Sequence, residues 1–298
     1  MTTSSEELVV VTGASTGLGR ATARELARCG FHVLAGVRRE TDAVAAPGIE
    51  PVLLDITRPE QVGALAARIG NRSVHALVNN AGIQVNAPVE TLPLDQWRHV
   101  FEVNLFGHIA VTQALLPVLR NGRVVNISSV GGKVAMPTYG AYAGAKFALE
   151  AVSDALRREG VQVVVIEPGG VRTEMARRGI ATANTLAADM TPEQNARYGR
   201  LIRTINELMA SGTEAGVTAE AAAQVVAKAV TTRRPRTRYT IGRDAALITR
   251  LSRVLPDRAL DRVIAALLNR TEREHARGTA DDLASGRFER RTSRLSER

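Results

Sequence analysis

The sequence has 298 residues, enough for one large α/β domain or two ordinary ones, and its 45% hydrophobic content can fill a core. A formal net charge of +9 raises the question of nucleic acid binding, because Lys and Arg bind phosphates. The basic residues are scattered, however, and aromatic residues make up only 3% of the chain. No nucleic-acid recognition motif accompanies the charge. We therefore expect a solvated basic surface with some attraction for phosphorylated ligands, and no nucleic acid partner.

The cysteine content and the hydropathy pattern indicate a cytoplasmic protein, and the histidine pattern bears on metal binding. The single cysteine, Cys29, has no partner for an intrachain disulfide, which fits a reducing compartment. The N-terminal residues lack the positive region of a signal peptide, and no stretch approaches the roughly 18 apolar residues of a membrane span. The histidines are dispersed without the spacing of metal ligands, so we expect no metal site.

Short runs of Val, Leu and Ile alternate with longer helical patterns from the N-terminus to Glu167. Continuous apolar runs are typical of parallel strands that are buried on both faces. The expected strands are Leu8–Thr12, His32–Val37, Val52–Leu54, Val74–Val78, Arg123–Ile127 and Val161–Glu167. The predicted fold is therefore α/β, a doubly wound parallel (Rossmann) sheet with helices on both faces.

After Pro168 the pattern changes. A polar, Ala-rich segment at about residues 174–216 predicts an inserted lid, and it is followed by a helix at Thr218–Thr231 and a further strand at Tyr239–Ile241. We expect residues 1–270 to form a single Rossmann-type catalytic domain. The charged tail, residues 271–298, has little to bury, and we expect it to be largely disordered.

Two amphipathic helices are expected within residues 244–270, separated by Pro256. Their apolar faces carry Leu247, Ile248, Leu251, Val254 and Leu255 in the first helix, and Leu260, Val263, Ile264, Leu267 and Leu268 in the second. Basic amphipathic helices can lie on a membrane surface. Because these segments lack Trp and Phe, we expect burial against the domain or a second subunit, and no membrane association.

The first expected strand leads directly into a glycine-rich segment with a helical pattern behind it. Glycines here allow a sharp turn and a close approach to a pyrophosphate, while the helix start supplies N–H donors. A phosphate loop of the Walker type is disfavoured, because Gly19 is followed by Arg and Ala. Taken alone, a glycine cluster is also typical of an ordinary turn. The segment reads Thr12-Gly13-Ala14-Ser15-Thr16-Gly17-Leu18-Gly19.

Tyr142 and Lys146 lie four residues apart in a helical stretch, so they present a phenol and an ammonium on one face. A nearby cation favours the phenolate and moves the phenol pKa toward the working range. Ser129, at the end of an expected strand, can hydrogen-bond a substrate oxygen. Ser128 and Tyr139 are rivals, although the residue four positions after Tyr139 is an alanine. A Tyr and Lys at this spacing can also be mere surface neighbours.

Together these motifs resemble the short-chain dehydrogenase/reductase family over about residues 6–245. The resemblance implies that Tyr142 is the general acid in carbonyl reduction and the general base in alcohol oxidation. It implies further that Lys146 holds the nicotinamide ribose and that Ser129, thirteen residues before Tyr142, positions the carbonyl. Asn104 resembles the residue that anchors a proton-relay water, or it is a core amide bonded to backbone.

The resemblance also implies a cofactor site. Arg38 stands at the end of the second strand, where NAD enzymes place an acidic residue, and an Arg there accommodates a 2′-phosphate. With help from the Ser15 hydroxyl, this predicts that NADP(H) is preferred over NAD(H), while Arg39 is a solvated neighbour. The implied cofactor-binding residues are Gly13, Ser15, Thr16, Gly17, Leu18, Gly19, Arg38, Asp55, Ile56, Asn80, Ala81, Gly82, Tyr142, Lys146, Pro168, Gly169, Val171 and Thr173.

The segment from Ser129 to Lys146 resembles the steroid and retinoid branch of the family. Apolar residues of the lid and of the segment around Val130–Thr138 are consistent with a bulky hydrophobic ketone or secondary alcohol as substrate, although the same residues could simply pack the lid onto the core. They are Met136, Met175, Leu186, Met190, Leu201, Ile205, Leu208 and Met209. We expect a homodimer or homotetramer. The alternative function is a catalytically silent NADP(H)-binding regulator or scaffold on the same fold.

Overall fold

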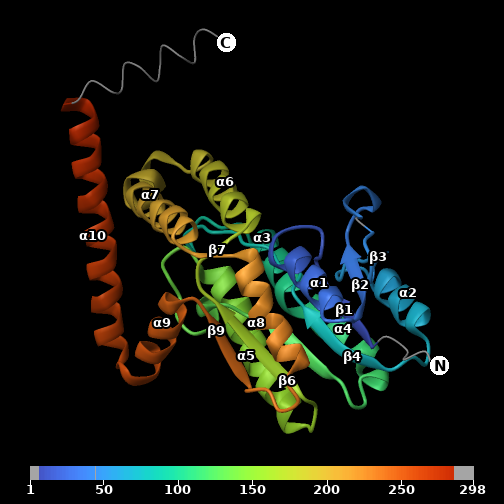
Figure 1. Cartoon of the computed structure of the whole chain (residues 1–298). Helices are drawn as coiled ribbons and strands as arrows, with labels where there is room; N and C mark the ends of the chain where they lie inside the picture. Colours follow the sequence, from blue (N-terminus) through green and yellow to red (C-terminus); the bar gives the residue numbers. More distant parts are fainter. Residues whose placement is uncertain (1–6, 44, 285–298) are drawn as a thin grey trace.

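The computed structural model describes residues 7–43 and 45–284 and is built on a seven-stranded parallel sheet (Figure 1). The strand order is β3-β2-β1-β4-β5-β6-β9, so the winding reverses between β1 and β4. In open α/β sheets ligands bind beyond the carboxyl ends of the strands at such a reversal. The strands are β1 (Leu8–Val11), β2 (His32–Val37), β3 (Ile49–Leu53), β4 (Val74–Asn79), β5 (Arg123–Ile127), β6 (Val163–Pro168) and β9 (Arg238–Ile241).

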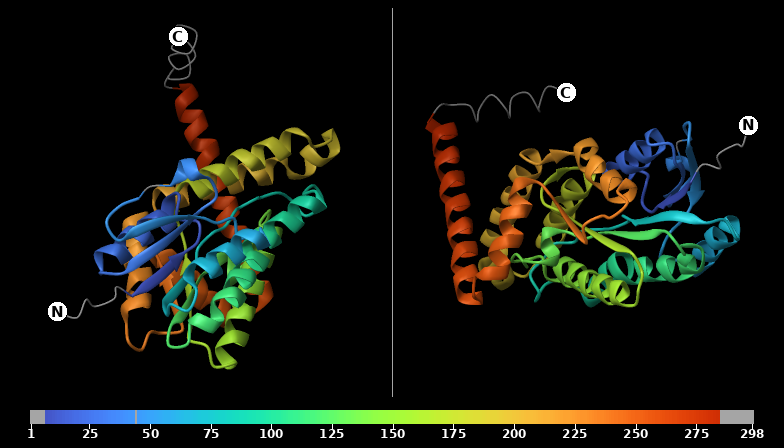
Figure 2. Two further views of the ribbon diagram at one scale, coloured as in Figure 1. Left: turned by 90° about the vertical axis from the view of Figure 1, so that its right-hand side faces the viewer. Right: turned by 60° about the horizontal axis from the view of Figure 1, so that its bottom comes forward.

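Helices cover both faces of the sheet, which confirms the predicted doubly wound α/β architecture (Figure 2). Alternate residues of one strand enter opposite cores: Val9 and Val11 pack on one face, and Leu8 and Val10 on the other. Period-two geometry therefore explains the continuous apolar runs. One face is covered by α1 (Gly17–Arg28) and α8 (Ala219–Thr231), the other by α2 (Pro59–Ile69), α4 (Gly107–Leu115) and α5 (Gly140–Arg158), with α3 (Leu94–Phe101) packed against α5. Short turns are η1 (Glu40–Asp42), η2 (Glu102–Phe106, a π-helix), η3 (Leu116–Val118) and η4 (Val130–Gly132).

The expected strands are found in place, and their ends differ by a few residues. The largest difference is at β3, which begins at Ile49 instead of Val52. Since β3 lies at the edge of the sheet, it tolerates Pro51 and the partly exposed Glu50. These two residues interrupted the apolar pattern, so the sequence located only the buried end of this strand.

The segment predicted to be a lid forms two helices, α6 (Glu174–Ala188) and α7 (Pro192–Glu214), which pack side by side (Figures 1 and 2). At their base, β7 (Val171–Arg172) pairs in parallel with β8 (Val217–Thr218). A Cβ added at Gly170 would lie 2.2 Å from the carbonyl oxygen of Gly212, so the two ends of the lid segment meet through close backbone contact. The helix pair α6–α7, which we call the lid, is therefore attached to the domain by closely packed backbone next to β7 and β8.

Two helices follow β9, as predicted: α9 (Arg243–Val254) and α10 (Asp257–Ala284). Helix α10 stands away from the sheet and packs against α7 (Figure 1). The domain buries Ala245 and Thr249 of α9 and leaves Leu247 and Val254 59% and 75% exposed. Ile248, Leu251 and Leu255 are partly buried, so the domain provides the expected burial of this apolar face only in part.

The prediction of a disordered tail from Thr271 is corrected by the structure, because α10 continues to Ala284. Ala, Glu and Arg in this stretch are favourable helix formers, and a lack of residues to bury does not prevent a helix. The rest of the predicted tail, residues 285–298, lies outside the described residues. Among the helices that the structure describes, none has the length and apolar character needed to cross a membrane.

Candidate active site

The glycine-rich segment forms the turn from β1 into α1, and backbone crowding requires its glycines. Gly13 and Gly17 have φ values of +66° and +52°, in the region that favours glycine. A Cβ added at Gly13 would lie 2.7 Å from Ala81 Cα, and one at Gly19 would lie 2.2 Å from the Gly13 carbonyl oxygen. Thr16, at the N-cap, makes no side-chain hydrogen bond to the first turn of α1. The backbone N–H groups there fit a pyrophosphate, as a dinucleotide site requires.

The end of β4 supports this turn through hydrogen bonds. Thr12 Oγ1 accepts from the backbone N–H groups of Asn80 at 2.9 Å and Ala81 at 3.0 Å. Asn80 Nδ2 donates to the carbonyl oxygens of Thr12 at 2.9 Å and Gly13 at 3.1 Å. The Asn80 side chain, predicted to bind cofactor, is therefore engaged in shaping the glycine turn.

Asp55, Ile56 and Arg38 lie toward the adenine end of the predicted cofactor site. Asp55 Oδ1 accepts from Thr57 N at 3.0 Å and from Thr57 Oγ1 at 2.7 Å. Burial raises the pKa of Asp55, but the Thr57 hydrogen bonds and the charges of Arg38 and Arg58 outweigh it and leave the pKa below its usual value. Ile56 is buried.

The two neighbouring arginines after β2 differ in their contacts. Arg39 is paired with Asp42 through two hydrogen bonds of 2.9 Å. Arg38 is exposed and makes no hydrogen bond or ion pair within the part of the chain that the structure describes. Arg20 donates to the carbonyl oxygen of Ser15. Arg38 is thus available to an anionic ligand at the end of β2.

The chemical end of the site lies where α5 meets the end of β5. Lys146 Nζ donates to the Ile127 carbonyl oxygen at 2.8 Å and lies 5.9 Å from the centre of the Tyr142 ring. Ser129 follows β5, its Oγ accepts from Gly131 N at 3.0 Å, and its hydroxyl acts on Tyr142 by lowering the pKa of the phenol. The rival Ser128 is buried beside Gly132. The structure thus brings together Ser129, Tyr142 and Lys146, the set that the sequence predicted.

The protonation of this set is governed by burial. Burial raises the pKa of Tyr142, and the hydrogen bond with Ser129 opposes the rise. Burial also lowers the pKa of Lys146 to about 8, against the charge of Glu150, which raises it. In this arrangement desolvation of the phenolate outweighs the lowering of the Tyr142 pKa that was expected from Lys146. Tyr142 is held as a neutral phenol, the form that donates a proton.

Asn104 lies in the π-helical turn η2 and is completely buried. Its Oδ1 accepts from Ile83 N at 2.9 Å, and its Nδ2 donates to the Ile83 carbonyl oxygen at 2.8 Å. One turn later, His108 Nε2 donates to the Ala81 carbonyl oxygen at 2.6 Å. The side chain of Asn104 is therefore an amide bonded to backbone, while its role in anchoring a proton-relay water stays a prediction. It fixes the backbone of the loop after Gly82.

A buried charge cluster behind Lys146 was missed by the sequence analysis. Glu150 Oε2 lies 2.7 Å from Lys133 Nζ and 3.1 Å from the guanidinium of Arg238, which also pairs with Asp154 at 2.8 Å. Arg238 lies far from the others in sequence, so this pairing had no local signal. The position of Glu150, four residues after Lys146 on the same helix, was the available clue.

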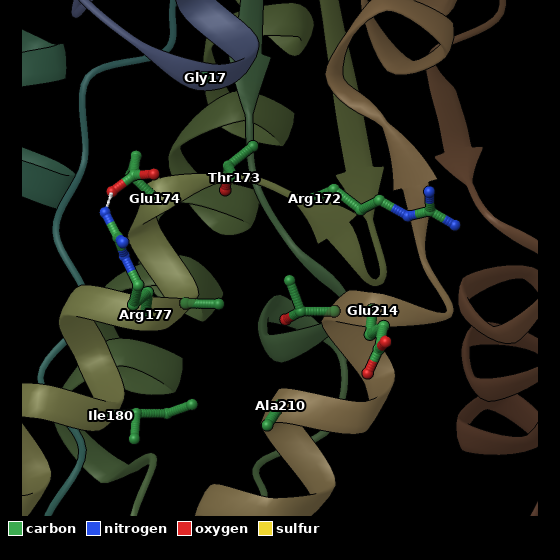
Figure 3. A pocket seen from close by; sticks show the side chains of 10 residues that line it. Gly17, Arg172, Thr173, Glu174, Arg177, Ile180, Ala210 and Glu214 are labelled. Atoms are coloured by element: carbon green, nitrogen blue, oxygen red, sulfur yellow. Dashed lines mark hydrogen bonds and ion pairs between the residues drawn. The ribbon is translucent and has the colours of Figure 1, made fainter. Parts of the chain in front are cut away.

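A pocket of about 580 Å³ opens between the glycine turn and the lid (Figure 3). Gly17 and Thr173, both predicted cofactor residues, line it together with residues of α6 and α7, while Arg172 points away from the Glu174–Arg177 pair (Figure 3). Its lining residues are Gly17, Arg172, Thr173, Glu174, Ala176, Arg177, Ile180, Ala210, Thr213 and Glu214. Neither Ser129 nor Tyr142 is among them. The pocket therefore joins the pyrophosphate end of the site to the lid.

The segment after β6 completes this side of the site. Pro168 ends the strand, and a Cβ added at Gly169 would lie 2.4 Å from Asp244 Oδ2. Val171 belongs to β7, and Thr173 is the N-cap of α6. Within the described residues, no group of three His, Cys, Asp or Glu side chains is placed to hold a metal ion.

A glycine turn at a helix start, together with Ser129, Tyr142 and Lys146 at the carboxyl end of the sheet, defines a dinucleotide-dependent oxidoreductase. The model of the short chain dehydrogenase family matches residues 7–184. The chain belongs to this family, and it is an oxidoreductase of CH–OH or C=O groups that uses NAD(P).

Relatives extend the similarity over most of the chain. Retinol dehydrogenase 5 of Mus musculus is 37% identical, over 89% of this chain and 90% of that protein. An NADPH-dependent 3-dehydrocapnine reductase of Ornithobacterium rhinotracheale is 30% identical, over 89% of this chain and 98% of that protein. These relatives support the predicted resemblance to the retinoid and steroid branch of the family.

Solved structures agree with the fold. A short-chain dehydrogenase from Streptomyces avermitilis superposes with a TM-score of 0.69 at 28% identity, covering 93% of this chain and 99% of that one. One from Burkholderia cenocepacia, in complex with NADP, gives a TM-score of 0.68 at 26% identity, with 88% and 98% covered.

Proposed function

We propose that the protein is an NADP(H)-dependent oxidoreductase that interconverts a bulky hydrophobic ketone and the corresponding secondary alcohol. The observation that carries the proposal is the convergence of Ser129, Tyr142 and Lys146 beyond the end of β5. A dinucleotide bound at the neighbouring glycine turn would bring hydride to the carbonyl that Tyr142 protonates.

In this mechanism the nicotinamide supplies hydride in reduction and accepts it in oxidation. The hydroxyl of Tyr142, neutral because of its burial, donates its proton to the substrate oxygen as the carbonyl is reduced. Ser129 hydrogen-bonds both Tyr142 and the substrate oxygen, so it aligns the two. Lys146 keeps a positive charge near the phenol and stabilises the phenolate that remains after transfer. Asn104 positions the Ile83 backbone beside the site.

The cofactor preference rests on Arg38. It makes no hydrogen bond or ion pair within the described residues, and it stands at the end of β2, where the ribose of a dinucleotide is read. A charge-assisted contact with a 2′-phosphate is worth about 1.5–3 kcal/mol, roughly ten- to a hundredfold in affinity.

The test of this preference is kcat/KM with NADPH and with NADH for the wild type, Arg38→Ala and the control Arg39→Ala. Arg38→Ala should lose most of the preference for NADPH, whereas Arg39→Ala should keep it, because Arg39 is held by Asp42. Equal use of both cofactors by the wild type would contradict the assignment, and so would an unchanged ratio in Arg38→Ala.

The proposed substrate class rests on the lid. Met175 lies near Gly82, since a Cβ added there would be 3.6 Å from Met175 Cε, and Ile180 and Ala210 line the adjoining pocket. Flexible apolar side chains suit bulky hydrophobic ligands. Purified protein should consume NADPH with steroid, retinoid or polycyclic ketones faster than with short aliphatic ketones, as followed by absorbance. A preference for short polar ketones would overturn the substrate class.

We also propose that the protein is a homodimer or homotetramer in the cytoplasm. Exposed aromatic side chains at Phe106 and Phe147 support the assembly, because large exposed apolar groups favour an interface. The lone cysteine supports a reducing compartment. Light scattering of the purified protein measures the assembly, and a monomeric mass would refute it.

A further inference from the structure

A polar cluster lies under the lid, next to Tyr142. Three hydrogen-bond donors converge on the sulfur of Met209 in α7: the Tyr139 hydroxyl at 3.1 Å, Gln84 Nε2 at 3.3 Å and Asn86 Nδ2 at 3.4 Å. Gln84 and Asn86 belong to the loop after β4, and Tyr139 is the N-cap of α5. Two separate segments therefore aim three donors at one atom.

This arrangement leaves the donors poorly satisfied. A thioether sulfur is a weak acceptor, so these donors are satisfied less well at Met209 than they would be at an oxygen atom. Gln84 Nε2 also donates to Asn86 Oδ1, at 3.4 Å. Asn86 is only 1% exposed and Met209 is buried as well. Burial raises the pKa of Tyr139 to about 12, so its hydroxyl remains a donor over the working pH range. An oxygen atom in place of the sulfur would satisfy the same donors better.

The cluster lies next to the proposed proton donor. The rings of Tyr139 and Tyr142 pack edge to face with centres 6.1 Å apart, so the cluster is one ring away from the proton donor. Met209 is carried by the lid, and its unbranched side chain can change rotamer at little cost. None of the three donors is charged, which favours a neutral oxygen over a carboxylate.

We propose that Gln84, Asn86 and Tyr139 form a second subsite that binds a neutral oxygen, a hydroxyl or carbonyl group, on the substrate several bonds away from the reacting carbonyl. Met209 occupies this position until the substrate oxygen displaces its sulfur. The inference rests on the proposed ketone reduction and narrows its substrates to hydrophobic ketones that carry a further oxygen.

The test compares 2-decalone with a set of hydroxydecalones that carry one hydroxyl at different positions of the far ring. We expect the wild type to show at least fivefold higher kcat/KM for one of the hydroxydecalones than for 2-decalone. Tyr139→Phe should remove this preference. Tyr198→Phe is the matched control, because it removes a phenol hydroxyl of α7 that donates to the exposed Glu90 and should keep the preference.

A second variant covers the case in which Tyr139→Phe does not fold. Met209→Leu keeps the bulk and removes the sulfur, so the donors lose their acceptor in the free enzyme, and the preference for the hydroxydecalone should rise. If the wild type reduces the ketones without favouring any hydroxyl position, or if both variants leave the ratio unchanged, the subsite is refuted while ketone reduction stands. If the wild type reduces none of the decalones or the wider ketone panel, the proposed function itself fails.

Discussion

His108 makes folding stability depend on pH in a window where few other side chains titrate. It is 1% exposed, its Nε2 donates to Ala81, and its Nδ1 has no partner among the described residues. The pKa of His108 is lowered to about 3. Burial is the main cause, the charge of Lys146 acts in the same direction, and the hydrogen bond to Ala81 opposes both. In the unfolded chain His108 therefore binds a proton as the pH falls through about 6.5, whereas in the folded chain it stays neutral. Stability is complete above pH 6.5 and falls as the pH falls below it.

The magnitude follows from the width of the window. One pKa unit is worth 1.36 kcal/mol, so at pH 5, about 1.5 units below the unfolded pKa, the loss is about 2 kcal/mol. Urea unfolding of the wild type at pH 6.5 and pH 5 measures this loss. His108→Gln keeps a donor for Ala81 but cannot titrate, so its loss over the same interval should be smaller by about 2 kcal/mol. His99→Gln, at an exposed position, is the control and should behave as the wild type. Equal pH dependence of His108→Gln and wild type would refute the reasoning.

Two further predictions concern the packing of the site and the C-terminal helix. Gly131→Ala should lower kcat about tenfold without weakening NADPH binding, because the added Cβ would lie 3.2 Å from the Tyr142 ring and displace the ring. Gly63→Ala on α2 is the control: its added Cβ would have no such atom within 4 Å, so kcat should not change. A chain ending at Arg270 should keep kcat within about threefold, since the ion pair of Glu272 with the exposed Arg200 is screened by solvent and contributes little to stability. Steady-state kinetics measure both, and loss of turnover in a folded truncated chain would make the end of α10 part of the site.

The local hydrophobic pattern of the sequence was sufficient to predict the strands of the sheet, because the central strands are buried on both faces. The run Leu8–Val11 enters two cores with alternate residues, so it stands out without any knowledge of its partners. The edge strand β3 was located only in part, because exposure admits Glu50 and Pro51. The end of α10 was missed because disorder was inferred from the shortage of apolar residues, while its residues favour a helix.

In the candidate site, too, some features could be predicted from local sequence and others could not. Spacing along one helix was enough to pair Tyr142 with Lys146, and the structure brings Ser129 to them. The direction of the Tyr142 pKa could not be predicted, because it depends on desolvation by segments distant in sequence. The contact of Tyr139 with Met209, 70 residues away, likewise depends on how the lid packs onto the domain.

The central claim is that Tyr142 transfers the proton in carbonyl reduction. The direct measurement is kcat for NADPH-dependent reduction of an accepted ketone by Tyr142→Phe. Fluorescence measures NADPH binding by the same variant. Tyr239→Phe, on the edge strand β9, is the control. Tyr142→Phe should bind NADPH as the wild type does and lose at least the roughly 10²–10⁴-fold typical of general acid catalysis, while Tyr239→Phe stays active. A kcat of Tyr142→Phe equal to that of the wild type would contradict the account.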